Sequence, residues 1–133
     1  MGTREDLGKL LLRLALAVVV LFHGVFKLRH GVAWMAQPLA AAGLPALLAY
    51  GTYLAEVLAP ALLLVGYKAR LAALVIAFDM LMAILLVLRP MLRTVRPQGG
   101  GWGVELEVLL LSAGLTVFLI GSGRYRLGRG AWD

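Results

Sequence analysis

Four long apolar runs constrain the fold of this chain more than any other feature. They cover residues 10–28, 47–66, 71–88 and 104–121, so each is 18 to 20 residues long. An α-helix rises about 1.5 Å per residue and needs about 20 apolar residues to cross roughly 30 Å of hydrocarbon. The sequence therefore predicts an all-α membrane protein, folded as a bundle of four transmembrane helices.

The composition agrees with a membrane protein and excludes several functions. The chain has 133 residues, 62% of them hydrophobic, which leaves room for four spans with short connections in a single membrane domain, residues 1–133. It has no cysteine, so iron–sulfur clusters and cysteine-based cofactors are not expected. The net charge is +6, but the basic residues lie mostly between or beside the apolar runs. This placement indicates membrane topology and contact with the lipid bilayer, and not nucleic-acid binding.

The loops predict how the bundle is oriented. Of the 13 Lys and Arg residues, eight lie on the side of the membrane that holds both termini and five on the other side. The positive-inside rule therefore places both termini in the cytoplasm. Between the first two spans, Trp34 and Pro38 precede Gly43, a pattern that predicts a short interfacial helix ending at Gly43.

Ionisable residues inside the apolar runs are the candidate functional residues. They are His23 and Lys27 in the first run, Glu56 in the second and Asp79 in the third. A charged side chain at the centre of a bilayer costs at least about 2.5–3.5 kcal/mol, so such residues usually have a partner or a function. For Asp79 we consider pairing with His23 or shielding within the bundle.

Glu56 is the most informative of these residues. It lies near the middle of the second run, with Thr52 and Tyr53 on the same helical face one turn earlier. Pro60 follows four residues later and has no N–H to donate to the Glu56 carbonyl, which should loosen the helix there. Two interpretations remain open: a neutral Glu56 that ties helices together, or a residue that handles a ligand or a proton.

The fourth run begins with two carboxyl groups, Glu105 and Glu107. Glu105 shares a helical stripe with Ser112 and Thr116, so we expect it to point into the bundle. Glu107 is turned by about 200° from Glu105 and is expected among the lipid headgroups.

Helix direction then predicts a pocket in the outer half of the bundle. His23 and Lys27 come near the outer end of the first helix, and Glu105 begins the fourth helix at the same level. Glu56 and Asp79 lie at mid-depth. We expect Lys27 to be paired with Glu105 or Glu56 in a pocket that opens to the outer face or leaflet.

Several short motifs, in order along nearly the whole chain, resemble the DoxX family of small four-helix bacterial membrane proteins. They are Leu12-Arg13-Leu14, the segment 21–28 with its Phe22-His23-Gly24, Glu56, Gly66 with Arg70-Leu71-Ala72-Ala73, Gly101-Trp102-Gly103-Val104-Glu105, and Gly121-Ser122-Gly123-Arg124-Tyr125. The chain departs from the family pattern at Ser122, Arg126 and Gly128, and Asp79 is not part of that pattern. The resemblance implies a subunit of the bacterial inner membrane associated with redox systems, among them quinone-dependent ones.

Three functions are compatible with these residues. In the first, the chain is a quinone-linked oxidoreductase subunit in which His23, Glu56 and Glu105 handle protons, while Lys27, His23, Tyr53 and Asp79 bind the quinone. Haem is not expected, because the two histidines, His23 and His30, lie near the same end of the first helix. No metal site is predicted.

The second function is a non-catalytic anchor or assembly subunit for a soluble redox enzyme. The third is a small-molecule permease that acts as a dimer, which the four spans disfavour because they lack an inverted repeat. Both a redox partner subunit and a second copy of the chain are therefore possible partners. The sequence does not decide whether the chain is catalytic.

Overall fold

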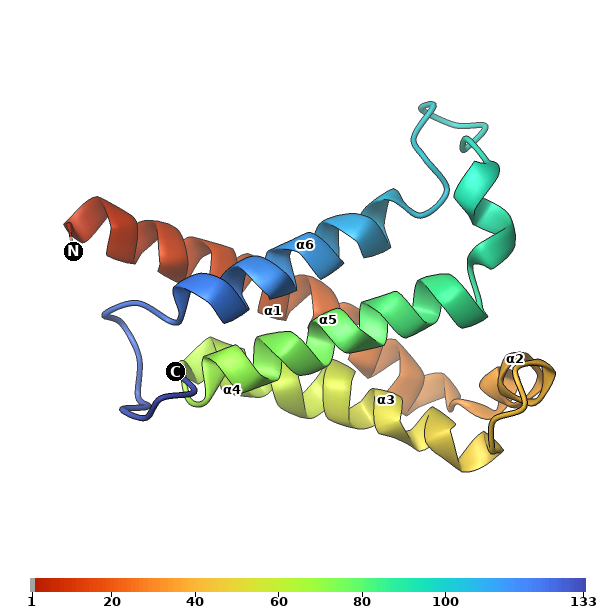
Figure 1. The fold of residues 1–133 in the computed structure, drawn as a ribbon, viewed down its shortest axis with the longest axis horizontal. Helices are drawn as coiled ribbons and strands as arrows, with labels where there is room; N and C mark the ends of the chain where they lie inside the picture. The colour runs from red at the N-terminus through yellow and green to blue at the C-terminus, as the bar shows by residue number, and fades with distance from the viewer. Residues whose placement is uncertain (1) are drawn as a thin grey trace.

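The structure, a computed structural model, describes residues 2–133 and is an elongated bundle of helices (Figure 1). Its elements in chain order are α1 (Thr3–His30), η1 (Ala33–Met35), α2 (Ala36–Ala41), η2 (Ala46–Tyr50), α3 (Gly51–Tyr53), η3 (Leu54–Leu58), α4 (Ala59–Val65), α5 (Ala69–Leu86), η4 (Arg89–Arg93) and α6 (Glu105–Ile120). Elements η1, η2 and η4 are 3₁₀ helices, and η3 is a π-helix. The prediction of an all-α membrane bundle is confirmed.

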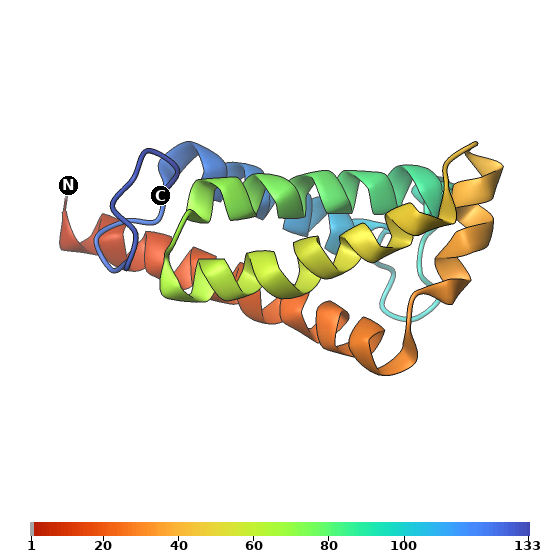
Figure 2. The same cartoon turned by 90° about the horizontal axis from the view of Figure 1, so that it is seen from below.

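Four long rods make up the bundle, and the second rod is composite. Elements η2, α3, η3 and α4 continue into one another, so that the chain from Ala46 to Val65 forms a single rod beside α1 and α5 (Figure 2). Three rods are long and apolar enough to cross a membrane: Thr3–His30, Ala46–Val65 and Ala69–Leu86. The fourth, α6, has 16 residues and packs along α5.

The two ends of the bundle differ. A short helix is present between the first two rods as predicted: α2 ends at Ala41, and Gly43 follows with a positive φ of 73°. Helix α2 lies across one end of the bundle, which we call the α2 end, and the N-terminus lies at the opposite end (Figure 1).

Small and branched apolar side chains fill the half of the bundle away from α2. The core there includes Leu16 and Val20 of α1, Leu63 of α4, and Ala73 and Ile76 of α5, each 2% exposed or less. Alanine and glycine on facing helices let backbones approach closely, which is how helices pack tightly in membranes. This half of the bundle is therefore closely packed.

Gly24 of α1 packs directly against the backbone of the second rod. A Cβ atom at this position would overlap the carbonyl oxygen of Glu56 in η3. We expect Gly24→Ala to push the two rods apart and to lower the free energy of unfolding by about 1–3 kcal/mol, the usual cost of overpacking. Thermal unfolding in detergent would measure the loss.

Gly8→Ala is the matched control for this prediction. Gly8 lies on the same helix, and a Cβ there would meet no atom within 4 Å. Because alanine favours a helix over glycine, this variant should be as stable as the wild type or more so. Equal melting of the two variants would show that the approach at Gly24 is not tight.

Residues 121–133 fold back over the end opposite α2, and we call this segment the tail cap. Buried Arg13, 2% exposed, holds it: Nη1 donates to the Ser122 carbonyl at 2.7 Å and Nη2 to the Tyr125 carbonyl at 2.8 Å. The tail cap also bonds to the end of α4, because the Leu127 and Gly128 amides each donate at 3.0 Å to the carbonyls of Val65 and Gly66. Arg13 is therefore a buried residue that holds the tail cap in place.

Candidate functional site

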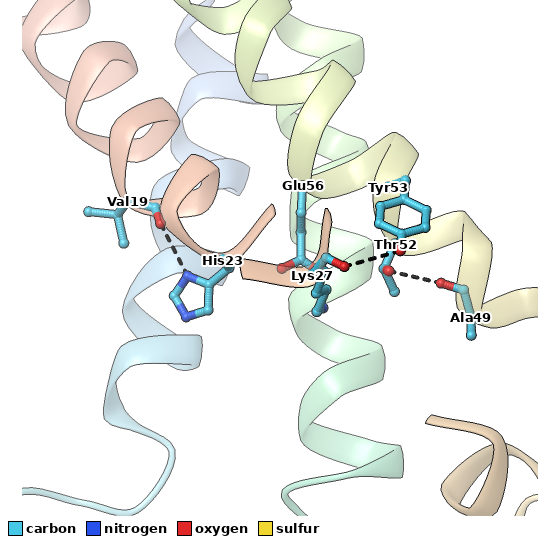
Figure 3. A network of polar contacts seen from close by, with 7 residues as sticks. All are labelled: Val19, His23, Lys27, Ala49, Thr52, Tyr53 and Glu56. Atoms are coloured by element: carbon cyan, nitrogen blue, oxygen red, sulfur yellow. Dashed lines mark hydrogen bonds and ion pairs between the residues drawn. The ribbon is translucent and has the colours of Figure 1, made fainter. Parts of the chain in front are cut away.

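An ion pair between Lys27 and Glu56 is the centre of the site. The ammonium of Lys27, in the last turns of α1, contacts the Glu56 carboxylate Oε2, which comes from η3 (Figure 3). The side chain of Glu56 is 2% exposed and that of Lys27 is 14% exposed. Of the two partners considered for Lys27, the structure selects Glu56.

The π-helix η3 explains how Glu56 reaches this place. A π-turn takes one more residue than an α-turn and is found mostly as a local bulge, often at functional sites. Pro60 lies four residues after Glu56 and cannot donate the α-helical hydrogen bond to its carbonyl. The wide turn thus forms where the sequence predicts a loosened helix.

Two neighbours on the second rod make hydrogen bonds beside the ion pair. The Tyr53 hydroxyl donates to the main-chain carbonyl of Lys27 at 3.2 Å, which ties the end of α1 to α3 (Figure 3). The buried Thr52 hydroxyl donates to the Ala49 carbonyl at 2.8 Å. Tyr53 therefore holds the backbone that carries Lys27.

His23 of α1 and Asp79 of α5 line the same cavity as Lys27 and Glu56. Nδ1 of His23 donates to the Val19 carbonyl at 3.1 Å, so the ring is held by its own helix. The Asp79 carboxyl lines the same cavity as Glu56 and Lys27 and interacts electrostatically with both. Asp79 thus joins Glu56, and we call Lys27, Glu56 and Asp79 the polar cluster.

A cavity of about 940 Å³ opens beside the polar cluster at the α2 end. Its lining is mostly apolar and aromatic, contributed by Phe22 and Phe26 of α1, Trp34 of η1 and several side chains of α5. The Trp34 ring lies over the Lys27 ammonium, with 6.0 Å between the nitrogen and the ring centroid. A large apolar cavity with a few convergent polar groups is the usual form of a small-molecule site.

The predicted orientation of the two carboxyl groups at the start of α6 is wrong. Glu105 is exposed and does not line the cavity, whereas Glu107 lines it. Glu105 therefore joins neither the polar cluster nor the predicted pairing with Lys27.

Ser112 and Thr116 do not mark the inner face of α6. Both residues are exposed, and each hydroxyl donates to the carbonyl four residues back on the same helix. The packed face is marked by Gly114, where a Cβ would lie 3.0 Å from the Ala73 carbonyl oxygen. Glu107 lies two turns before Gly114 on that face, so the glycine was the signal that could have identified it.

A family model described as DoxX matches residues 8–89. The chain belongs to the DoxX family. In this DoxX protein the matched region includes the polar cluster, His23 and Tyr53, and it ends before Glu107. No curated protein and no solved structure matches the chain at a significant level.

Sequence motifs that lie far apart in the chain meet in two places. Arg13 and the segment 121–125 meet in the tail cap, where the guanidinium holds two main-chain carbonyls. His23, Gly24 and Glu56 meet at the contact of α1 with η3. One place closes the bundle, and the other forms a wall of the cavity.

Proposed function

We propose that this DoxX protein is an integral subunit of a redox-associated membrane system and that it binds a quinone in the cavity at the α2 end. One observation carries the proposal: the polar cluster stands at the wall of a large cavity whose remaining lining is mainly apolar. A quinone has the matching chemistry, because its head carries carbonyl oxygens and its isoprenoid tail is apolar.

The polar cluster supplies what a quinone head requires. The Lys27 ammonium donates hydrogen bonds, and His23 lines the same wall of the cavity. Two carboxyl groups beside one ammonium are neutral together when the carboxyls share one proton. Glu56 and Asp79 line the cavity together, and we expect a proton held between them to be the one that the cluster exchanges with a ligand oxygen.

The apolar part of the cavity suits the ring and the tail. Phe22, Phe26 and Trp34 offer aromatic surface to a flat head group, and Met80 and Met82 of α5 offer flexible apolar surface. A cavity of about 940 Å³ lies near the upper end of the usual range for ligand sites, about 300–1,000 Å³, so it has room for a substituted ring and the first part of a tail.

The distribution of positive charge supports one orientation in the membrane. Because Lys and Arg residues are in excess on the side of the termini, we infer that the tail cap lies in the cytoplasm and the cavity in the outer half of a bacterial inner membrane. A quinone would then enter from the outer leaflet. The proposal includes a partner subunit that exchanges electrons with the bound quinone.

The tail cap supports a second candidate function, that of a non-catalytic anchor for a soluble redox enzyme. Arg124, Arg126 and Arg129 are exposed on a segment that Arg13 holds in place. An acidic surface of a soluble protein could dock on these three side chains. In this alternative the polar cluster only determines how the helices pack.

Mass spectrometry of organic extracts tests the quinone. The protein is purified with native lipids as wild type, Glu56→Gln and Glu105→Gln, and folding is checked by circular dichroism and gel filtration. We expect near-stoichiometric quinone in the wild type and in Glu105→Gln, whose exposed carboxyl is the matched control, and a loss of at least about tenfold in Glu56→Gln. Wild-type protein without quinone would contradict the proposal and favour the anchor.

A further inference from the structure

Glu107 is a polar group of the cavity that the polar cluster does not account for. It lines the cavity with Leu110, its neighbour one turn along α6. Its Oε2 atom is buried, and among the described residues it has no hydrogen-bond partner. A buried polar atom without a partner costs about 1–3 kcal/mol, so each such atom needs an explanation.

Glu107 and Glu56 approach the cavity from different sides. Helix α5 packs against both η3, which carries Glu56, and α6, which carries Glu107. Figure 1 shows α5 between α6 and the second rod over most of their length. The cavity therefore has one polar wall at the polar cluster and a second polar group at the start of α6.

We propose that the Glu107 carboxyl, in its protonated form, donates a hydrogen bond to the second polar atom of a ligand whose first polar atom meets the polar cluster. The ligand class is a para-quinone, because its two carbonyl oxygens lie at opposite ends of one ring. Each oxygen needs a donor, and a neutral carboxyl has one whereas a carboxylate only accepts. This inference rests on the proposed function and adds the residue that recognises the second carbonyl.

Trp34 provides the signal for a direct test. Its ring lines the cavity beside Lys27, so a quinone bound there should quench its fluorescence. Purified protein in detergent is titrated with ubiquinone-1, and Trp34→Phe shows which part of the quenching comes from the cavity. The variants are Glu107→Leu, Glu107→Gln and, as the matched control, Glu105→Leu, in which an exposed carboxyl two residues away is removed.

The expected pattern separates the two carboxyl groups. Glu107→Leu should weaken ubiquinone-1 binding about tenfold, because the hydrogen bond to one carbonyl is lost. Glu107→Gln should stay within about threefold of the wild type, because its amide still donates. Glu105→Leu should bind as the wild type does.

Other patterns contradict either this inference or the proposed function. Wild-type affinity in Glu107→Leu would overturn the donor function of Glu107 and leave quinone binding intact. A wild-type protein whose Trp34 is not quenched would contradict the proposed function itself. If Glu107→Leu does not fold, a Glu107→Gln variant that binds more than tenfold weaker than the wild type overturns the inference.

Discussion

Lys27→Met is expected to destabilise the protein by about 3–5 kcal/mol, because it leaves the buried Glu56 carboxyl without its cationic partner. The cost arises from an uncompensated buried charge, and the methionine itself should fit the mostly apolar surroundings of the lysine stem. The free energy of unfolding, measured by chemical denaturation in mixed micelles, would show the loss.

Two further variants identify the cause. Arg29→Met removes an exposed cation two residues later on α1 and should change stability by no more than about 0.5 kcal/mol. The double variant Lys27→Met with Glu56→Gln removes both charges and should recover much of the stability that the single variant loses. A Lys27→Met protein as stable as Arg29→Met would show that the ion pair does not hold the bundle together.

Arg13→Met is expected to release the tail cap. The change removes the donors that bind the Ser122 and Tyr125 carbonyls, and each buried carbonyl left without a partner costs about 1–3 kcal/mol. The segment should then open to water, because opening satisfies both carbonyls. Hydrogen exchange of the Leu127 and Gly128 amides, which donate to the end of α4, should accelerate by at least about tenfold.

Limited trypsin digestion gives a second measurement of the same opening. Cleavage after Arg124 and Arg126 should be faster in Arg13→Met than in the wild type. Arg4→Met is the control, because it removes an exposed arginine from the first turn of α1. Its tail should be cleaved at the wild-type rate. Unchanged exchange and cleavage in Arg13→Met would mean that contacts other than the guanidinium hold the tail cap.

The membrane rods and the polar cluster were predictable because their signals are local. A run of about 20 apolar residues must be a helix in a bilayer, since only a helix satisfies its own backbone polar groups there. An ionisable side chain within such a run points into the bundle, because facing the lipid would cost a large free energy. This rule identified Lys27, Glu56 and Asp79. Pro60 likewise predicted the loosened turn, although not that the turn would be a π-helix.

Two features were not predictable, for different physical reasons. Glu105 and Glu107 begin the same helix, and the sequence does not decide which faces inward until its packed face is known. Exposed serine and threonine can satisfy their hydroxyls on their own helix, so they are poor markers of that face. Arg13 pairs with carbonyls 109 and 112 residues away, and no spacing rule connects positions so distant.

The bundle has a cavity at its α2 end and is closed at the end that holds the termini. Apolar side chains fill the half toward the termini, and the segment clamped by Arg13 covers that end, while the hollow lies near α2. A solute that crossed along the long axis would have to displace both the packed core side chains and the tail cap. The shape therefore favours a ligand that enters and leaves the cavity by the same end. It disfavours passage through the whole bundle, as a permease requires.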